Sequence, residues 1–122
     1  MTTYEQLLAD CIRWAKEAGR IQLELFRSDR LDIEAKFNDS DVVTNADKAS
    51  EKAIISEIRR AYPEHSVLSE EAGCDKRMND WLWVIDPLDG TTNYSSGLPN
   101  FCVSIGVQHK GQTVVGVVYA PY

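Results

Sequence analysis

Apolar residues recur at alternating steps of three and four along the first part of the chain. They stand at Tyr4, Leu7, Cys11, Trp14, Ala18, Ile21 and Leu25, with Leu8, Ile12 and Ala15 widening the stripe. This spacing predicts an amphipathic helix from Thr3 to about Arg27. Thr3 followed by Gln6 is typical of a capping box. A coiled coil is the alternative, which the short repeat and the small residues Ala18 and Gly19 disfavour.

A second helix is predicted after a short extended segment. Residues 31–37 alternate between apolar and polar side chains, which predicts a strand or an extended loop, and residues 38–41 interrupt it. The helix is expected to open near Thr44, with Asp47 in its first turn. It should end at Tyr62, because Pro63 follows.

The periodicity then changes to that of strands. Short segments rich in β-branched and aromatic residues are found at Ser66–Ser69, Trp81–Asp86, Phe101–Gln108 and Thr113–Tyr119. The last two are joined through residues 109–112, a hairpin signal. We therefore predict an α/β layered fold, with two helices packed on one face of a mainly antiparallel sheet. The final strand stands at the end of the printed sequence, where we expect a neighbouring segment beside it.

Composition places the chain among ordinary globular proteins and excludes some partners. It has 122 residues, the size of one domain, with 43% hydrophobic and 26% charged residues. No apolar run approaches a membrane span of about 20 residues, and the polar N-terminus does not predict a secretory signal. The net charge of −6 argues against a nucleic-acid surface. We expect a cytoplasmic protein that does not bind membranes.

Cysteine and histidine carry no predicted chemistry. The three cysteines are far apart and form no C-x-x-C pair, so neither disulfides nor a thiolate zinc site is indicated. Cys11 and Cys102 are expected to be buried, whereas Cys74 lies in a polar loop. His65 and His109 are both expected at the surface, the first beside a helix end and the second in the hairpin turn.

An acidic octapeptide, Asp-Pro-Leu-Asp-Gly-Thr-Thr-Asn, begins where the third strand segment ends. Asp86 and Asp89 cannot face one point from a straight strand, so we expect Pro87 to turn the chain. Both carboxylates and the Leu88 carbonyl would then converge on a hard cation, which prefers oxygen ligands. Gly90 lets the backbone come close to a ligand, and N–H groups after it would cradle a phosphate. An ordinary Asp-Gly hairpin turn is the alternative.

Two further acidic elements lie at the ends of apolar segments. Glu70 and Glu71 follow the strand that ends at Ser69, and adjacent carboxylates are costly to hold together unless they are solvated or bound to a metal. A charged surface loop is the alternative. Asp47 could simply complement the helix dipole. Three acidic elements in such positions favour a shared site.

These segments together resemble the inositol monophosphatase family. The resemblance is carried, in order and at family-like spacing, by residues 43–47, 69–71, 86–93, 97–99 and 103–106. It extends over nearly the whole chain. The family's fold is an αβαβα sandwich, of which residues 1–122 resemble the N-terminal, metal- and phosphate-binding lobe. The C-terminal lobe is expected to be absent, because members of the family are about twice as long.

The resemblance implies a metal centre. Glu70, Asp86 and the Leu88 carbonyl would hold the first Mg²⁺, and Asp86 with Asp89 would contribute to a second. Two or three Mg²⁺ ions are implied, with Mn²⁺ as a substitute. The C-terminal half of family members supplies another aspartate ligand, usually after a tryptophan. Trp81 precedes the octapeptide and is interpreted as a core residue, so this chain offers no such ligand.

The resemblance also implies the reaction. Gly90 and Thr91 would contact the substrate phosphate, and Thr91 with Asp47 would orient and deprotonate a water activated at the metal held by Glu70. Glu71 looks like a supporting partner behind the ligands. The implied activity is hydrolysis of a phosphate monoester, inositol monophosphate first among candidates, by a lithium-sensitive homodimer. No Ser, Cys or His nucleophile with a base partner is evident.

Three alternatives stay open. A fructose-1,6-bisphosphatase and a nucleotide 3′-phosphatase share the same metal motif, and this sequence does not separate them from the inositol enzyme. A different class of function is a catalytically incomplete lobe that binds metal or serves in assembly. The missing aspartate ligand favours this last alternative for the 122-residue chain by itself.

Overall fold

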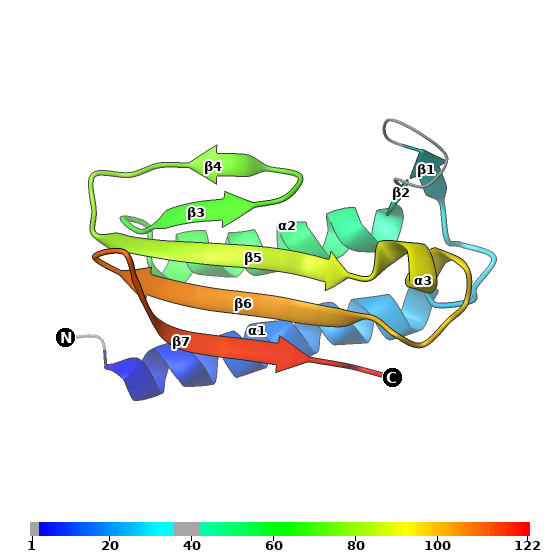
Figure 1. The fold of residues 1–122 in the computed structure, drawn as a ribbon, viewed down its shortest axis with the longest axis horizontal. Helices are drawn as coiled ribbons and strands as arrows, with labels where there is room; N and C mark the ends of the chain where they lie inside the picture. The colour runs from blue at the N-terminus through cyan, green and yellow to red at the C-terminus, as the bar shows by residue number, and fades with distance from the viewer. Residues whose placement is uncertain (1–2, 36–41) are drawn as a thin grey trace.

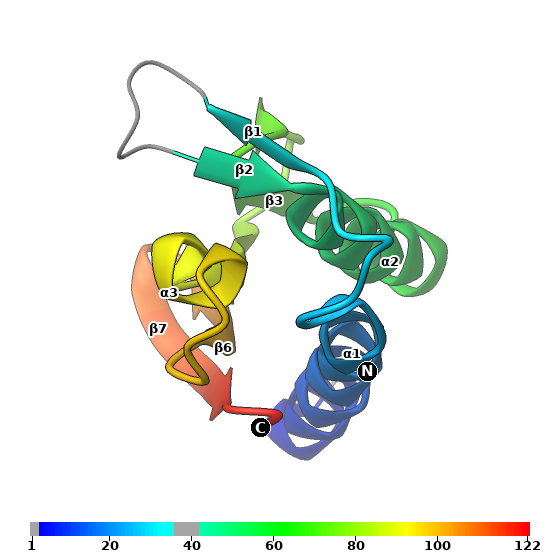
Figure 2. The ribbon, with the colours of Figure 1, turned by 90° about the vertical axis from the view of Figure 1, so that its right-hand side faces the viewer.

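Two helices cover one face of a five-stranded sheet in the computed structural model, which describes residues 3–35 and 42–122 (Figure 1). The elements are α1 (Tyr4–Leu25), β1 (Ile33–Ala35), β2 (Val42–Thr44), α2 (Asn45–Ala61), β3 (Ser66–Ser69), β4 (Gly73–Asp75), β5 (Trp81–Asp89), α3 (Thr91–Ser95), β6 (Cys102–His109) and β7 (Gln112–Tyr119). The end-on view shows α1 and α2 side by side on the same side of the sheet (Figure 2). The predicted layered α/β fold is confirmed.

The sheet has the order β4-β3-β5-β6-β7. Only β3 and β5 run parallel, and the other neighbours pair antiparallel, as the prediction of a mainly antiparallel sheet requires. The β6–β7 hairpin closes through Lys110 and Gly111, which both have positive φ, the turn geometry that matches the twist of antiparallel strands. A separate two-stranded sheet, β1 with β2, lies beside α3.

Helix α1 begins with the predicted capping box, in which Thr3 and Gln6 satisfy each other's backbone N–H groups. Its buried face is rotated from the predicted stripe. The buried residues are Leu7, Cys11, Trp14, Ala15, Ala18, Gly19 and Gln22. Gln22 is therefore in the core, whereas Ile21 is only half-buried and Leu8 and Ile12 are exposed.

Helix α2 also begins and ends as predicted. Thr44 and Asp47 form its capping box, and the helix ends at Ala61, one residue before its C-cap Tyr62. The strands β3, β5, β6 and β7 fall where the sequence predicted them. The elements β2 and β4 were not predicted, because each is only three residues long and shows no clear periodicity. The predicted break at residues 38–41 lies outside the described residues.

The hydrophobic core lies between the helices and the sheet. Its main cluster joins α1 and α2 to the inner face of β3, β5, β6 and β7. A second, smaller cluster of Ala46, Leu88, Tyr94 and Phe101 lies at the end of β5. The two clusters give β5 packed support along its length, up to the acidic octapeptide.

The predicted surface position of His65 is wrong. His65 is only 8% exposed, and its Nδ1 accepts a hydrogen bond from the indole Nε1 of Trp83 at 2.9 Å. Its ring stacks with the rings of Tyr62 and Trp81. His109 is half-buried and also stacks with Trp81, with 4.0 Å between the ring centroids. Aromatic neighbours from separate elements, which the local sequence does not reveal, account for both positions.

The three cysteines are free thiols. Cys11 is buried and Cys74 is exposed, as predicted. Cys102 is only half-buried, because it stands at the start of β6 opposite Asp89 rather than over the core. Among the helices of the described residues, none has the length and apolar character needed to cross a membrane.

Candidate functional site

The acidic octapeptide begins with a bulge in β5. Asp86 pairs with Ser104 and Asp89 pairs with Cys102, so β5 contains one residue more than β6 between these two pairs. Pro87 falls inside the bulge, where a missing N–H costs no ladder hydrogen bond. The expected turn at Pro87 is therefore wrong: β5 continues to Asp89, and the bulge, not a turn, redirects the side chains.

Helix α3 follows the bulge directly. Its N-cap is Gly90, which has a φ of 92° in the left-handed region. A Cβ atom on Gly90 would lie 2.6 Å from the backbone oxygen of Asn100. The chain's own packing thus accounts for this glycine, independently of the ligand approach that the sequence suggested.

A hollow of about 360 Å³ opens where β5 meets α3. Its lining residues are Val42, Glu70, Asp86, Leu88, Asp89, Gly90, Thr91, Thr92 and Asn93. Six of the predicted site residues, Glu70, Asp86, Leu88, Asp89, Gly90 and Thr91, therefore face one space. Segments that are 15 or more residues apart in the sequence meet here because β3 and β5 run parallel and end at the same edge.

The charged form of the Asp86 carboxylate is poorly accommodated unless a ligand binds beside it. Burial raises its pKa to about 6, and the negative charges of Asp89, Glu70 and Asp47 add to the effect. Its Oδ1 is buried and has no hydrogen-bond partner. A carboxylate oxygen that is buried and unpaired is costly, and a cation bound in the hollow would remove this cost.

Asp47 and Thr91, which the resemblance places together, are in contact. The Thr91 hydroxyl lies 2.8 Å from Asp47 Oδ1 and 3.1 Å from the Leu88 carbonyl oxygen. Asp47 Oδ2 accepts hydrogen bonds from the backbone N–H and the hydroxyl of Thr44. Asp47 is 5% exposed and does not line the hollow. It therefore reaches the hollow through Thr91.

The carboxylates do not form a closed metal cage. Within residues 3–35 and 42–122, no three His, Cys, Asp or Glu side chains are gathered closely enough to hold an ion. The donors that line the hollow are nevertheless all oxygens, which suits Mg²⁺. The unpaired Asp86 oxygen and the Leu88 carbonyl are the parts of the site that fit such an ion best.

Sequence reasoning missed the residue that holds the Glu70 loop. Glu51 Oε2 accepts hydrogen bonds from the Ser69 hydroxyl at 2.6 Å and from the backbone N–H groups of Glu71 and Ala72 at 3.2 and 3.1 Å. Glu51 lies four residues after Asp47 on α2, which is the one signal that places it on the same helix face. Glu71, predicted to support the ligands, is exposed and contacts Glu51 through its backbone.

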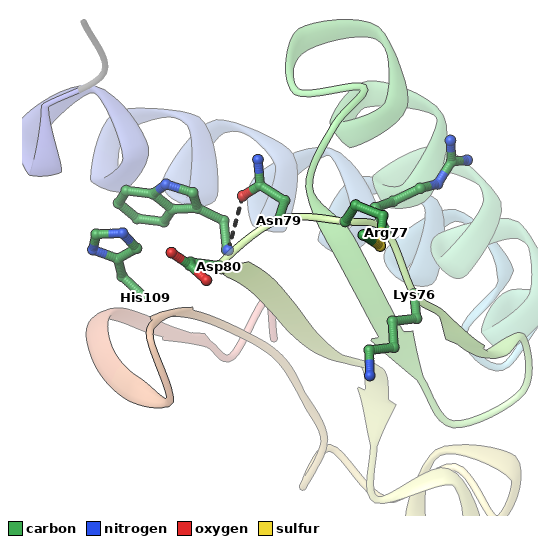
Figure 3. Close-up of a pocket in the computed structure, with 7 residues that line it drawn as sticks. Lys76, Arg77, Asn79, Asp80 and His109 are labelled. Atoms are coloured by element: carbon green, nitrogen blue, oxygen red, sulfur yellow. Dashed lines mark hydrogen bonds between the residues drawn. The ribbon is translucent and has the colours of Figure 1, made fainter.

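A larger hollow, of about 550 Å³, lies at the opposite end of β5 (Figure 3). Its lining residues are Lys76, Arg77, Met78, Asn79, Asp80, Trp81 and His109. Arg77 is paired with Asp75, and the Asn79 side chain accepts the backbone N–H of Trp81. Only one carboxylate, that of Asp80, lines this hollow. The side chains of this larger hollow do not match the acidic site that the sequence predicts. The volume of a hollow alone would therefore point to the wrong end of β5.

The helix-on-sheet fold and the oxygen-lined hollow at the end of β5 define an α/β protein with an acidic site. The chain belongs to the inositol monophosphatase family, which it matches over residues 3–122. It is 50% identical over 117 residues to the Nus factor SuhB of Pasteurella multocida (strain Pm70), covering 94% of this chain and 43% of that protein.

Solved structures agree with the family. The inositol monophosphatase from Anabaena (Nostoc) sp. PCC 7120 is 39% identical, with a TM-score of 0.79 over 98% of this chain and 42% of that chain. An IMPase/NADP phosphatase solved with Mg²⁺ and phosphate is 25% identical, with a TM-score of 0.83 over 98% of this chain and 46% of that chain. The chain thus spans less than half the length of the relatives it matches.

Proposed function

We propose that this chain is the metal- and phosphate-binding lobe of a Mg²⁺-dependent phosphomonoester hydrolase whose preferred substrate is inositol monophosphate. The observation that carries the proposal is the buried, unpaired Oδ1 of Asp86 beside a hollow lined by oxygen donors. Family membership and the Mg²⁺ and phosphate found in a related structure support the same chemistry.

Four donors of this chain would hold the metal. Asp86, Glu70 and the Leu88 carbonyl would hold the first ion, and Asp86 with Asp89 would contribute to a second. When bound, Mg²⁺ supplies positive charge to the phosphate oxygens and lowers the pKa of a bound water. Mn²⁺ is expected to substitute, since it prefers the same oxygen donors.

The remaining groups act on the water and on the phosphate. The Thr91 hydroxyl donates its proton to Asp47, which leaves its oxygen lone pairs to accept a hydrogen bond from the attacking water. Asp47 is the group that can receive a proton along this path, and Thr44 fixes its orientation. Gly90 and Thr91 would contact the phosphate from the rim of the hollow.

The decisive experiment measures phosphate release from inositol monophosphate as a function of Mg²⁺, with and without Li⁺. It uses the chain itself and a chimera in which this chain replaces the matching span of the Anabaena enzyme. Asp86→Asn should lower metal-dependent turnover of the chimera by more than about 100-fold, since even partners behind metal ligands account for 10–100-fold. Asp80→Asn, in the other hollow, is the matched control. Full turnover by the Asp86→Asn chimera would refute the two-metal proposal.

Substrate choice within this chemistry is tested with the same protein. Fructose 1,6-bisphosphate and a nucleotide 3′-phosphate are the competing substrates, because they need the same metal donors and differ in the group that carries the phosphate. A higher kcat/KM for inositol monophosphate supports the preferred substrate. A homodimer is part of the proposal, and sedimentation that shows only a monomer would contradict it.

A second candidate function comes from the name of the relatives. Relatives that are 42–50% identical to this chain are named Nus factor SuhB. The competing proposal is therefore that the chain is a catalytically incomplete lobe that binds metal or serves in assembly. Mn²⁺ binding without turnover in both the chain and the chimera would favour it over the hydrolase.

A further inference from the structure

The amide of Gln22 joins helix α1 to the bulge of β5. Gln22 is fully buried, and its Nε2 donates to the Pro87 carbonyl oxygen at 2.6 Å and to the Ser50 hydroxyl at 3.1 Å. Residues 22 and 87 come from opposite layers of the fold. One buried side chain therefore connects α1, α2 and β5 at a single point.

The orientation of this amide follows from its partner. The Pro87 carbonyl only accepts hydrogen bonds, so the NH₂ group of Gln22 must face it. The consequence is that Gln22 Oε1 is buried without a partner. An apolar side chain at this helix position would fill the core without that cost. The hydrogen bonds to Pro87 and Ser50 are thus the features that distinguish glutamine from leucine or methionine here, and the bond to Pro87 is the shorter one.

Pro87 stands between two of the proposed metal donors. Its carbonyl is held toward α1 by Gln22, whereas the next carbonyl, that of Leu88, meets the Thr91 hydroxyl beside the hollow. The Pro87 carbonyl lies in the peptide plane that joins Pro87 to Leu88, so holding this carbonyl fixes the orientation of that plane. The plane lies between the Asp86 carboxylate and the Leu88 carbonyl.

The backbone of the same residue holds the other end of the segment. The hydroxyl of Tyr94, a fully buried residue of α3, donates to the Gln22 carbonyl oxygen at 2.8 Å. Gln22 is therefore bound to residues on both sides of Leu88, Asp89 and Gly90.

We propose that Gln22 is a positioning residue for the metal site, which sets the β5 bulge so that Asp86 and the Leu88 carbonyl face the hollow. The inference rests on the proposed function, because it assigns Gln22 a role toward the same donors. It predicts that the metal site weakens when the amide donor is removed, even though the core stays filled.

The test compares Gln22→Met with Ser50→Ala in the 122-residue chain. Methionine keeps the length of the side chain and loses both hydrogen bonds, whereas Ser50→Ala removes one partner of Gln22 and leaves the Pro87 bond intact. Mn²⁺ binding, followed by electron paramagnetic resonance, should weaken about 10–100-fold in Gln22→Met and less than about twofold in Ser50→Ala. Equal weakening in the two variants would overturn the proposal, as would none in Gln22→Met.

Amide hydrogen exchange gives a readout that does not depend on metal. Exchange at residues 88–91 should accelerate in Gln22→Met, while exchange in the β6–β7 hairpin stays unchanged. Uniform acceleration in both regions would show a merely structural role and overturn the inference. If the wild-type chain binds no Mn²⁺, the proposed function fails, and the exchange pattern still decides the role of Gln22.

If Gln22→Met does not fold, one measurement on the wild-type chain still tests the proposal. A through-bond NMR coupling between the Gln22 side-chain nitrogen and the Pro87 carbonyl carbon should be detectable, because the hydrogen bond is short and buried. Its absence would contradict the proposal directly.

Discussion

The two acidic arms of the candidate site are supported in opposite ways. The β5–α3 arm, which carries Asp86 and Thr91, continues into the core through Leu88 and Tyr94, which are 2% and 0% exposed. The β3–β4 arm, which carries Glu70, consists of exposed residues after Ser69. The first arm is fixed by packing. The second depends on hydrogen bonds to a carboxylate of α2.

The difference suggests that the two arms have different roles in metal binding. The proposed donors on the β5–α3 arm are held by packing before any ion arrives, which would lower the cost of binding. We expect Glu70, the proposed donor on the other arm, to adjust its position more than Asp86 when an ion binds, because the residues after Ser69 are exposed.

Removing packing under the first arm should have the largest effect. Leu88→Ala deletes a buried side chain of the cluster behind the site, so the free energy of unfolding should fall by about 2–5 kcal/mol. Glu70→Gln on the exposed arm should change it by less than about 0.5 kcal/mol. Urea unfolding followed by circular dichroism measures both. Similar losses in the two variants would remove the contrast between the arms.

Removing the support of the second arm should have a smaller and more local effect. Glu51→Ala deletes the acceptor of three hydrogen bonds to Ser69, Glu71 and Ala72, at an expected cost of about 1–2 kcal/mol in unfolding free energy. Mn²⁺ binding should weaken, because the Glu70 loop loses its anchor. Glu57→Ala, at a half-buried position on the same helix whose carboxylate pairs with Arg60 away from the site, is the control. Unchanged amide exchange at residues 71 and 72 would contradict the assigned role of Glu51.

The acid sensitivity of the fold should come from the far end of β5, away from both arms. Burial lowers the pKa of His65 below its ordinary value of 6.5 and the His109 charge adds to this, while Glu64 opposes it. Between the lowered pKa and 6.5 the unfolded chain binds more protons than the folded chain, so stability falls as the pH drops through this window. Asp86, whose pKa is raised to about 6, changes stability in the opposite direction as the pH falls. The contribution of His65 is therefore the difference in thermal unfolding between the wild-type chain and a variant without this ring, measured from pH 7.5 to 5.

Two histidine variants separate the sources of this pH dependence. His65→Gln removes the titrating ring and should flatten the decline in melting temperature below pH 6.5. His109→Gln, which changes the half-buried neighbour, should leave most of it. An equal decline in wild-type and His65→Gln would show that the buried ring does not control the acid response.

Local sequence signals predicted the two helices and the acidic segments, but not the contacts that hold these segments in place. The period of the α1 stripe was enough to predict the first helix, and Thr44, Asp47 and Pro63 were enough to predict the bounds of the second, because helix formation is encoded within one segment. The acidic segments were found because each lies at the end of an apolar segment. The bulge at Pro87 was mistaken for a turn, since proline and glycine signal both.

The contacts that were missed all connect distant segments. Gln22 meets Pro87 across 65 positions, and Trp83 meets His65 across 18. A polar residue next to an apolar stripe is normally exposed, so a one-residue rotation of α1 was enough to hide Gln22 from the prediction. Such residues become visible only once the layers are packed together.

The smallest effect is expected at the exposed end of the first arm, where Cys102 faces Asp89. The Cys102 thiol lies 3.9 Å from Asp89 Oδ2, and burial together with the Asp89 charge raises the pKa of this thiol. A neutral thiol is a weak donor, and Asp89 is exposed to water that can replace it. Cys102→Ala should therefore change Mn²⁺ affinity by less than about twofold, far below the effect of Gln22→Met. A larger change, measured in the same resonance titration, would show that support at this end of the arm also depends on one side chain.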